Sequence, residues 1–302
     1  MKKIKILIFF VFCLVISYTA RAQQVPFYTQ WMFNEYIINP GVAGTLNAFQ
    51  IRANTRVQWI GIDGAPRTMG VSAYGPLKKQ PMGYGGYIYN DITGPDSRLS
   101  LGGTYAYNYP ISDAMRISAG LSVGLIQYKL DNTQIDIGDQ AGNDPAFTGS
   151  VESSYVPDAS FGIYVYSTLY YAGISAHQLI GSKLNNLYEE EIGINRLKQH
   201  FYLAGGYNII LNRDYAIQPS LLLKYMSPGQ IQGELNAKAT YKRVAWFGLS
   251  YRTGDALCVL GGYNYENKMY IGISYDITTS ELRKYSSGTI EIMLGYRFNN
   301  LK

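Results

Sequence analysis

Side chains that alternate between two characters constrain the fold of this chain more than any other feature. Residues 289–298, TIEIMLGYRF, are the clearest example, because every second side chain is large and apolar or aromatic. A period of two is that of a β-strand, whose successive side chains point to opposite faces. In a soluble protein the apolar face would meet a core. In an outer-membrane barrel it would meet lipid, and the polar face would meet a wet lumen.

The same alternation recurs almost throughout the chain, for example in residues 115–125, 231–241 and 268–277. An even number of antiparallel strands of about 9–11 residues is typical of bacterial outer-membrane barrels. We therefore predict an all-β fold, a transmembrane antiparallel β-barrel of about 14 strands. The predicted strands are 49–58, 67–77, 82–91, 98–109, 114–129, 158–167, 169–177, 199–209, 214–226, 230–241, 243–252, 256–265, 268–277 and 288–298.

Composition favours the membrane alternative. Charged residues make up only 16% of the chain, against about 25% in average soluble domains. The chain also has 29 Tyr and 32 Gly, which suit aromatic girdles at a membrane interface and close packing inside a barrel.

Residues 1–22 have the parts of a secretory signal peptide. Lys2, Lys3 and Lys5 precede an apolar stretch at 6–16, and Ala20-Arg21-Ala22 fits a cleavage site. We expect the mature chain to begin at Gln23; the alternative is an uncleaved anchor. The basic residues of this segment account for most of the net charge of +5, so the mature chain gives no sign of nucleic-acid binding. Without Cys13 only Cys258 remains, which excludes an intramolecular disulfide.

The stretch before the first strand, residues 23–48, is rich in aromatic side chains and contains the turn signal Asn39-Pro40-Gly41. We predict a plug-like segment that packs in the periplasmic mouth or the lumen, with Trp31, Met32 and Phe33 buried. The alternative is a short extra edge element. The predicted organisation is a signal peptide at 1–22, this segment at 23–48 and an outer-membrane barrel at 49–302.

Four motifs carry a resemblance to a known family: NPGVAG at 39–44, RVQWIGIDGAPRT at 56–68, NDITGP at 90–95 and LGYRF at 294–298. Together they resemble the PorP/SprF family, outer-membrane proteins of the type IX secretion system of Bacteroidota. The resemblance implies a non-enzymatic protein in the bacterial outer membrane that supports secretion or surface anchoring of cargo such as adhesins, with a link to gliding motility in some members. It implies as partners a secreted protein with a C-terminal secretion domain, other secretion components and outer-membrane lipid. The candidate motif or partner residues are Asn39, Pro40, Gly44, Gln58, Trp59, Gly61, Gly64, Pro66, Asp91, Gly94 and Pro95.

The motif residues also have a physical interpretation. Gly61, Gly64 and Pro66 would build one tight outer loop of fixed shape, and Asp91, Gly94 and Pro95 would build the next. Such loops either form a receptor surface at the rim or fold inward and close the pore. We expect two longer outer connections, 130–157 and 178–198, whose acidic residues form either solvated loops or a docking surface. These residues are Asp131, Asp136, Asp139, Asp144, Glu152, Glu189, Glu190 and Glu191.

Catalytic chemistry has little support in the sequence. The only histidines, His177 and His200, end one predicted strand and begin the next, so they could face each other. Two imidazoles with the glutamates of the intervening loop make at best a weak metal site, since zinc needs three or four placed ligands. Ser175 lies on the same strand face as His177 but has no defined orienting acid. We predict no enzyme activity, no cofactor and no metal.

The main rival function is a general or solute-specific porin, which needs an open lumen. Bulky tyrosines at inward-facing positions would narrow such a channel, which weighs against this alternative. They are Tyr87, Tyr89, Tyr164, Tyr166 and Tyr270.

Overall fold

Most of the regular structure in this chain is β-strand. The computed structural model describes residues 25–134, 150–184 and 196–300. Its strands are β1 (Ala48–Val57), β2 (Arg67–Pro76), β3 (Met82–Thr93), β4 (Asp96–Pro110), β5 (Met115–Asp131), β6 (Val151–Ser167), β7 (Tyr170–His177), β8 (His200–Tyr207), β9 (Ile209–Ile210), β10 (Tyr215–Met226), β11 (Gln230–Tyr241), β12 (Ala245–Arg252), β13 (Ala256–Tyr265), β14 (Met269–Thr278) and β15 (Thr289–Asn300). Short 3₁₀ helices are η1 (Trp31–Phe33), η2 (Glu35–Ile37), η3 (Pro40–Val42), η4 (Asn132–Gln134) and η7 (Glu281–Lys284). Among the described residues, no helix has the length and apolar character to cross a membrane.

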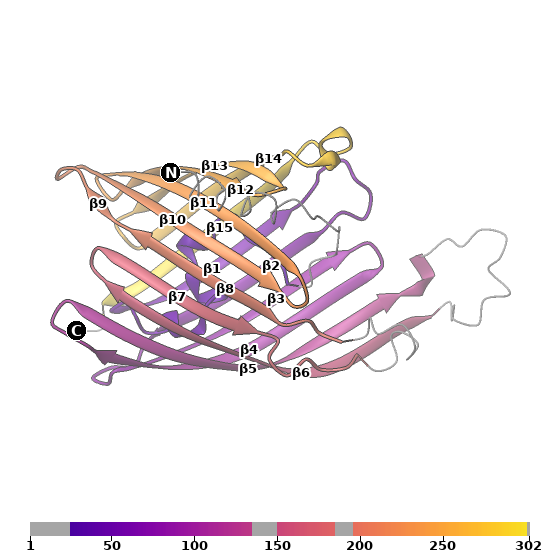
Figure 1. The fold of residues 1–302 in the computed structure, drawn as a ribbon, viewed down its shortest axis with the longest axis horizontal. Helices are drawn as coiled ribbons and strands as arrows, with labels where there is room; N and C mark the ends of the chain where they lie inside the picture. The colour runs from indigo at the N-terminus through magenta and orange to yellow at the C-terminus, as the bar shows by residue number, and fades with distance from the viewer. Residues whose placement is uncertain (1–24, 135–149, 185–195, 301–302) are drawn as a thin grey trace, which may run out of the picture.

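The strands form a single closed antiparallel sheet (Figure 1). Each strand pairs with its neighbours in the sequence, and the ring closes because β1 pairs with β15. β8 and the two-residue β9 pair with β10 in one continuous register, interrupted at Asn208, so they make one strand of the ring. The fifteen labelled strands therefore form a ring of fourteen, as predicted. Closure leaves no unpaired sheet edge along the wall, which is what a membrane-spanning sheet requires.

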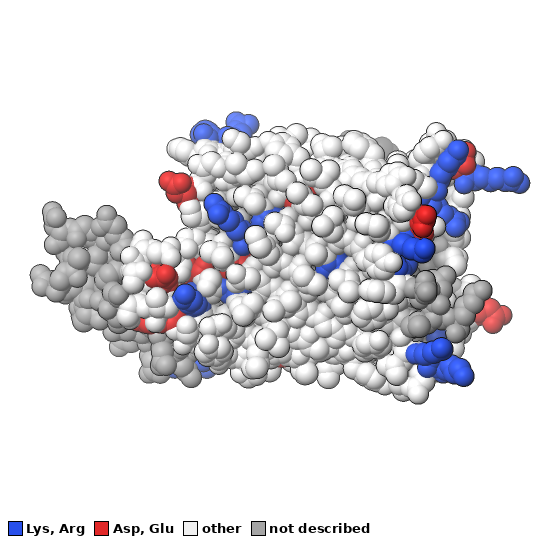
Figure 2. Space-filling view, turned by 180° about the vertical axis from the view of Figure 1, so that it is seen from behind, with Lys and Arg blue, Asp and Glu red and all other residues white. Residues whose placement is uncertain are grey.

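The apolar face of the sheet points outward. On β15, the outward side chains of Ile292 and Leu294 are 46% and 52% exposed, whereas Glu291 and Met293, which alternate with them, are fully buried. The outer surface in Figure 2 carries few charged atoms along the middle of the barrel, and Lys and Arg gather toward its two ends. This is the inverse of a soluble sandwich and matches a wall immersed in lipid.

The expected loop at 130–157 is wrong in part, because β5 runs on to Asp131 and β6 begins at Val151. The two form a hairpin that extends beyond the neighbouring strands (Figure 1). Pro157 made this part of β6 look like a loop. Its carbonyl accepts a hydrogen bond from Ser182 on the side away from β5, so the N–H that proline lacks is not needed for pairing with β5. Asp131 and Glu152 therefore lie on paired strands, and Asp136, Asp139 and Asp144 lie outside the described residues.

The connections fall at two ends of the barrel. We call the end that carries 58–66, 94–95, 132–150, 178–199, 227–229, 253–255 and 279–288 the loop end. The opposite turn end carries the connections 77–81, 111–114, 168–169, 211–214, 242–244 and 266–268, together with the start of β1 and the end of β15. Long connections occur only at the loop end, and the turns at the other end have five residues or fewer.

The chain before β1 lies inside the barrel. We call residues 25–47, which include η1, η2 and η3, the lumenal segment. It begins beside Lys224 near the loop end and reaches Asn108 near the turn end, so it traverses the lumen lengthwise. Trp31 and Met32 are buried and Phe33 is half-buried. The segment pairs with no strand, so the alternative of an extra edge element is wrong.

Candidate functional site

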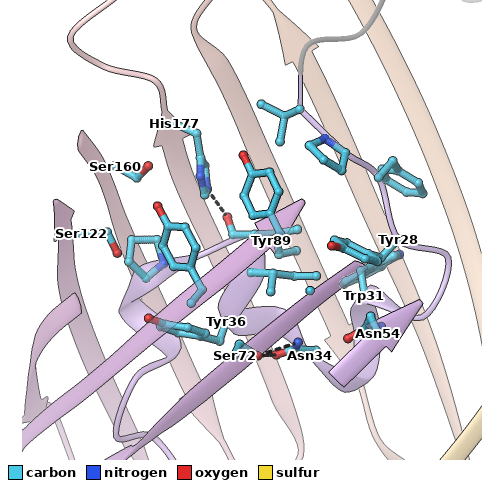
Figure 3. Close-up of a pocket in the computed structure, with 18 of the residues that line it drawn as sticks. Tyr28, Trp31, Asn34, Tyr36, Asn54, Ser72, Tyr89, Ser122, Ser160 and His177 are labelled. Carbon is cyan, nitrogen blue, oxygen red and sulfur yellow. Dashed lines mark hydrogen bonds between the residues drawn. The ribbon is translucent and has the colours of Figure 1, made fainter. Parts of the chain in front are cut away.

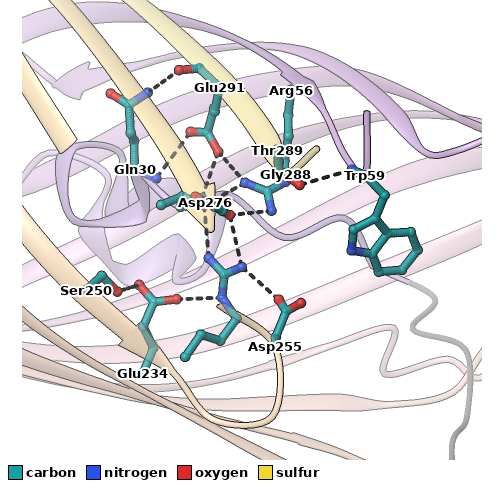
Figure 4. A network of polar contacts seen from close by, with 12 residues as sticks. Gln30, Arg56, Trp59, Glu234, Ser250, Asp255, Asp276, Gly288, Thr289 and Glu291 are labelled. Atoms are coloured by element: carbon teal, nitrogen blue, oxygen red, sulfur yellow. Dashed lines mark hydrogen bonds and ion pairs between the residues drawn. The ribbon is translucent and has the colours of Figure 1, made fainter. Parts of the chain in front are cut away.

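The loop-end half of the lumenal segment is held by a buried ionic network (Figure 4). Arg56 of β1 lies 2.9 Å from Asp276 of β14 and 3.2 Å from Glu291 of β15. Arg252 of β12 reaches the same Asp276 oxygen at 3.2 Å. Thr29 joins all of these groups, because its hydroxyl donates to Asp276 and accepts from Arg56 at 2.6 Å and from Arg252 at 2.9 Å. One threonine of the segment therefore connects three strands of the wall.

Backbone groups of the segment complete the network. The Thr29 and Gln30 N–H groups donate to the Glu291 carboxylate at 2.7 and 3.2 Å, and the Gln30 side chain donates to the Glu291 carbonyl at 3.2 Å. Glu291 is fully buried, and these donors add to its ion pair with Arg56 in compensating its charge. The wall and the segment are therefore electrostatically complementary.

A second carboxylate, Glu234 of β11, extends the contact. It accepts from the Trp31 indole N–H at 3.0 Å, from the Ser250 hydroxyl at 2.8 Å and from Arg252 Nε at 2.9 Å. Arg252 also pairs with the half-buried Asp255 at 2.9 Å. The indole thus combines a buried aromatic ring with a polar anchor to the wall.

Aromatic side chains pack together on the turn-end side of this network. The Phe33 ring lies 4.0 Å from the Trp246 ring and 5.1 Å from the Tyr270 ring, centroid to centroid. Lys238 lies over the Phe33 ring at 4.7 Å, and the Arg52 guanidinium lies over Tyr270 at 4.6 Å. These contacts place cations against ring faces, where cation–π attraction is favourable.

The NPG turn packs against glycines of the wall strands, whose lack of a side chain lets the two backbones approach closely. The Asn39 carboxamide accepts from Gly41 N at 2.8 Å and donates to the carbonyls of Ile163 and Ile174, which belong to β6 and β7. A Cβ on Gly120 would lie 2.4 Å from the Pro40 carbonyl carbon. Gly44 has a φ of +78° and lies so close to Gly83 that a Cβ on Gly44 would be 2.5 Å from the Gly83 Cα. Asn39, Pro40 and Gly44 therefore lie together between the segment and the wall.

Other motif residues lie at the loop end, in what we call the loop-end rim, residues 58–66, 94–95 and 279–288. Gln58 N donates to the Pro66 carbonyl at 2.9 Å, which closes the first loop, and Gly94 N donates to the Gly64 carbonyl at 2.7 Å, which joins it to the second. Trp59 N donates to the Thr289 hydroxyl at 3.0 Å (Figure 4), and residue Ile60 exchanges backbone bonds with the third connection. The three connections therefore form one bonded unit.

Glycines fix the shape of this rim. Gly61, Gly64 and Gly94 have φ of +101°, +70° and +55°, a region that disfavours residues with a Cβ. Asp91, near the loop end of β3, accepts a hydrogen bond from the Thr68 hydroxyl. The Pro95 carbonyl accepts one from Asp131 N at 2.9 Å. The eleven motif residues thus separate into a group in the lumen and a group at the loop end.

His177 and His200 are register partners, as the sequence suggested, but each binds a separate backbone carbonyl. His177 Nε2 lies 2.8 Å from Ile38 O, and His200 Nδ1 lies 2.8 Å from Lys198 O. The Ser175 hydroxyl donates to the same Ile38 carbonyl. In the part of the chain that the structure describes, no three His, Cys, Asp or Glu residues are placed to hold a metal; Glu189, Glu190 and Glu191 lie outside it.

The five tyrosines predicted to face inward do so. Tyr164 donates to Glu35 of η2 at 2.6 Å, Tyr166 donates to Asn108 at 3.1 Å, and Tyr270 packs in the aromatic group of Phe33. Tyr87 and Tyr89 line a cavity beside the lumenal segment. Their rings fill space between the segment and the wall.

The sequence analysis missed the ionic network altogether. A signal was present, since Arg56, Glu234, Arg252, Asp276 and Glu291 all lie in the polar phase of strands with apolar outer faces. The alternation alone places them in the lumen but does not say which of them meet, because contacting pairs lie as far apart as residues 56 and 291. The role of Thr29 carries no sequence signal.

Solved structures similar to this chain are outer-membrane barrels. The toluene transporter TbuX of Ralstonia pickettii aligns with a TM-score of 0.54 at 9% identity, over 87% of this chain and 92% of that one. The monoaromatic hydrocarbon channel CymD aligns with a TM-score of 0.53 at 11% identity, over 92% and 95%. The toluene transporter TodX of Pseudomonas putida gives 0.53 at 9%, over 87% and 93%. At these identities the likeness concerns the fold.

No curated protein matches the sequence. The sequence pattern of one protein family, described as the type IX secretion system membrane protein PorP/SprF, matches residues 20–296. This range covers almost the whole chain, and the barrel fold places the protein in the bacterial outer membrane. The chain therefore belongs to the PorP/SprF family of type IX secretion system membrane proteins.

Proposed function

We propose that this outer-membrane barrel is a non-enzymatic accessory of the type IX secretion system that supports secretion or surface anchoring of cargo such as adhesins, and through such cargo supports gliding. The observation that carries the proposal is the lumenal segment. Its Thr29 and Trp31 are tied into the buried ionic network, and its Asn39 is tied to β6 and β7. A lumen filled and bonded in this way favours a protein that works through its surfaces.

The loop-end rim is the surface that we assign to the partner, with the loop end facing the cell exterior. Its three connections are bonded to one another, and glycines with positive φ hold their shape. η7 presents exposed Glu281 and Lys284, and Tyr285 is 73% exposed. A rigid rim with exposed aromatic and charged side chains fits a partner without the cost of ordering loops on binding.

A substitution that distorts the rim tests this assignment. Gly64→Ala places a Cβ 3.1 Å from Gly94 Cα at a φ of +70°. Gly229→Ala is the matched control, since Gly229 also has positive φ and lies in a loop-end connection, but its Cβ would have no atom within 4 Å. Cells that carry either variant in place of the native protein are assayed for cargo in the medium and on the surface, at matched amounts of the barrel.

We expect Gly64→Ala to reduce cargo secretion or retention at least tenfold and Gly229→Ala to leave it close to the wild-type level. Affinity isolation from gently solubilised outer membranes, followed by mass spectrometry, identifies the partner. Recovery of neither a secreted protein nor another secretion component with the wild-type barrel would count against the proposal.

The second candidate function is a solute-specific porin, favoured by the fold similarity to hydrocarbon channels. The filled lumen weighs against it. Swelling of liposomes that contain the purified barrel separates the two functions. A porin would admit small solutes and cause swelling, whereas the proposed accessory would give the same rate as empty liposomes.

A further inference from the structure

A cavity of about 60 Å³ lies between the lumenal segment and the wall (Figure 3). Tyr28 and Tyr36 contribute from the segment, and Tyr89, Ser122, Ser160 and His177 contribute from the wall strands. At roughly 10–15 Å³ for each water, this space has room for about four to six water-sized groups. The cavity is therefore large enough for a small molecule of few non-hydrogen atoms.

Two buried polar side chains that line the cavity have atoms without a hydrogen-bond partner among the described residues. Gln178 is 1% exposed, and within the described chain neither its amide oxygen nor its amide nitrogen has a hydrogen-bond partner. Asp158 is 7% exposed, and its Oδ1 is likewise without a partner among the described residues. Buried polar atoms without partners are costly, so a cavity that concentrates them is suited to a ligand that supplies the missing bonds.

The backbone at Gln178 turns its side chain into this cavity. Along β7 the inward positions are the odd-numbered residues, which end with Ser175 and His177. Gln178 would therefore face outward if the strand continued, but its φ of +56° breaks the alternation. His177 and Gln178 consequently line the same cavity. A left-handed conformation is unfavourable for a residue with a Cβ and is found more often at binding sites.

The ligand chemistry follows from the groups left open. The Asp158 and Gln178 oxygens require donors, and the Gln178 amide nitrogen requires an acceptor. A hydroxyl group does both, and the flat faces of Tyr28, Tyr89 and Tyr202 offer apolar contact to carbon atoms between hydroxyls. From this geometry we infer that the cavity is a binding site for a small neutral polyol of about the size of glycerol.

The charges around the cavity favour a neutral ligand. Asp158 is the carboxylate that lines the cavity, and the positive charge of Arg98 acts on it. The positive charge of Lys224 on β10 repels a positive charge on His177. The charges of Asp158 and Arg98 are opposite and offset one another, so the cavity strongly favours neither a cation nor an anion. The site is independent of the secretion role and is tested separately from it.

Saturation-transfer NMR on the purified full-length barrel, in a deuterated detergent without a sugar head group, measures this binding directly. Glycerol is the probe, and maltose is the size control because a disaccharide exceeds the cavity. Gln178→Leu and Asp158→Leu remove the open polar atoms with little change in size. Asn236→Leu is the matched control, since both amide atoms of this buried lumenal residue also lack a partner in the described chain, but it does not line the cavity.

We expect saturable glycerol binding by the wild type and by Asn236→Leu, no saturable maltose binding, and at least a tenfold loss of glycerol affinity in Gln178→Leu and Asp158→Leu. Asp158→Asn keeps an acceptor oxygen and should stay within about threefold of the wild type. A heat-dependent shift on gel electrophoresis verifies that each variant is folded. Equal glycerol signals in all folded variants, or no saturable signal in the wild type, would overturn the inference.

Discussion

Among single residues, the buried ionic network depends most on Thr29, through its hydroxyl group. It donates to Asp276 and accepts from Arg56 and Arg252, so Thr29→Val, which keeps the shape, leaves three buried charged groups with one partner fewer. Hydrogen bonds to charged groups are worth about 1.5–3 kcal/mol, and we expect a loss of that size in the free energy of unfolding. Urea titration of the refolded barrel measures it.

Thr45→Val is the control for this substitution, because among the described residues the Thr45 hydroxyl bonds only the neutral Val42 carbonyl. Its expected loss is about 0.5–1.5 kcal/mol. If the two variants lost the same stability, the Thr29 hydroxyl would not have the role assigned to it.

Glycine on the lumenal face of β5 gives a second residue-scale prediction. A Cβ on Gly120 would meet the Pro40 backbone at 2.4 Å, whereas a Cβ on Gly103 of β4 would have no atom within 4 Å. Gly120→Ala should therefore destabilise the barrel by about 1–3 kcal/mol and move the lumenal segment, as an overpacked core does. Gly103→Ala should be neutral or slightly stabilising. Thermal unfolding and tryptophan fluorescence, to which Trp31 contributes together with Trp59 and Trp246, distinguish these outcomes.

At the scale of elements, the lumenal segment and the ring are separable. The wall strands pair only with one another, and the segment adds side-chain and backbone contacts without joining the sheet. A variant that lacks residues 25–44 should retain the strand content of the full protein by circular dichroism and unfold at a lower temperature. Loss of the strand signal would mean that the ring needs the segment in order to close.

The sequence predicts elements well where the alternation is clean and fails where another rule intervenes. β14 and β15 were located within two residues, because lipid selects one face and the lumen the other. The first part of β6 was missed, because Pro157 and the polar residues around it resemble a loop. The docking of Asn39 against Gly162 and Gly173 could not be predicted either, since it depends on how β6 and β7 are placed around the NPG turn.

At the scale of the whole molecule, the ring of fourteen strands turns its apolar side chains outward and encloses a lumen. Inward side chains and the lumenal segment fill that lumen. Apolar side chains such as Leu235, which is 61% exposed, cover the wall, so lipid contact needs no helix. Charged side chains and tyrosines of the wall face the lumen, where they form hydrogen bonds with the lumenal segment along its length, for example Glu291 with Thr29 and Tyr164 with Glu35. We propose that this segment closes the lumen of the barrel.

Single-channel recording in planar lipid bilayers measures whether ions pass through the lumen. The full mature protein and the variant without residues 25–44 are inserted under the same conditions. We predict no steady conductance from the full protein and stable open channels from the variant. A large, steady conductance from the full protein would show that the lumenal segment leaves the lumen open.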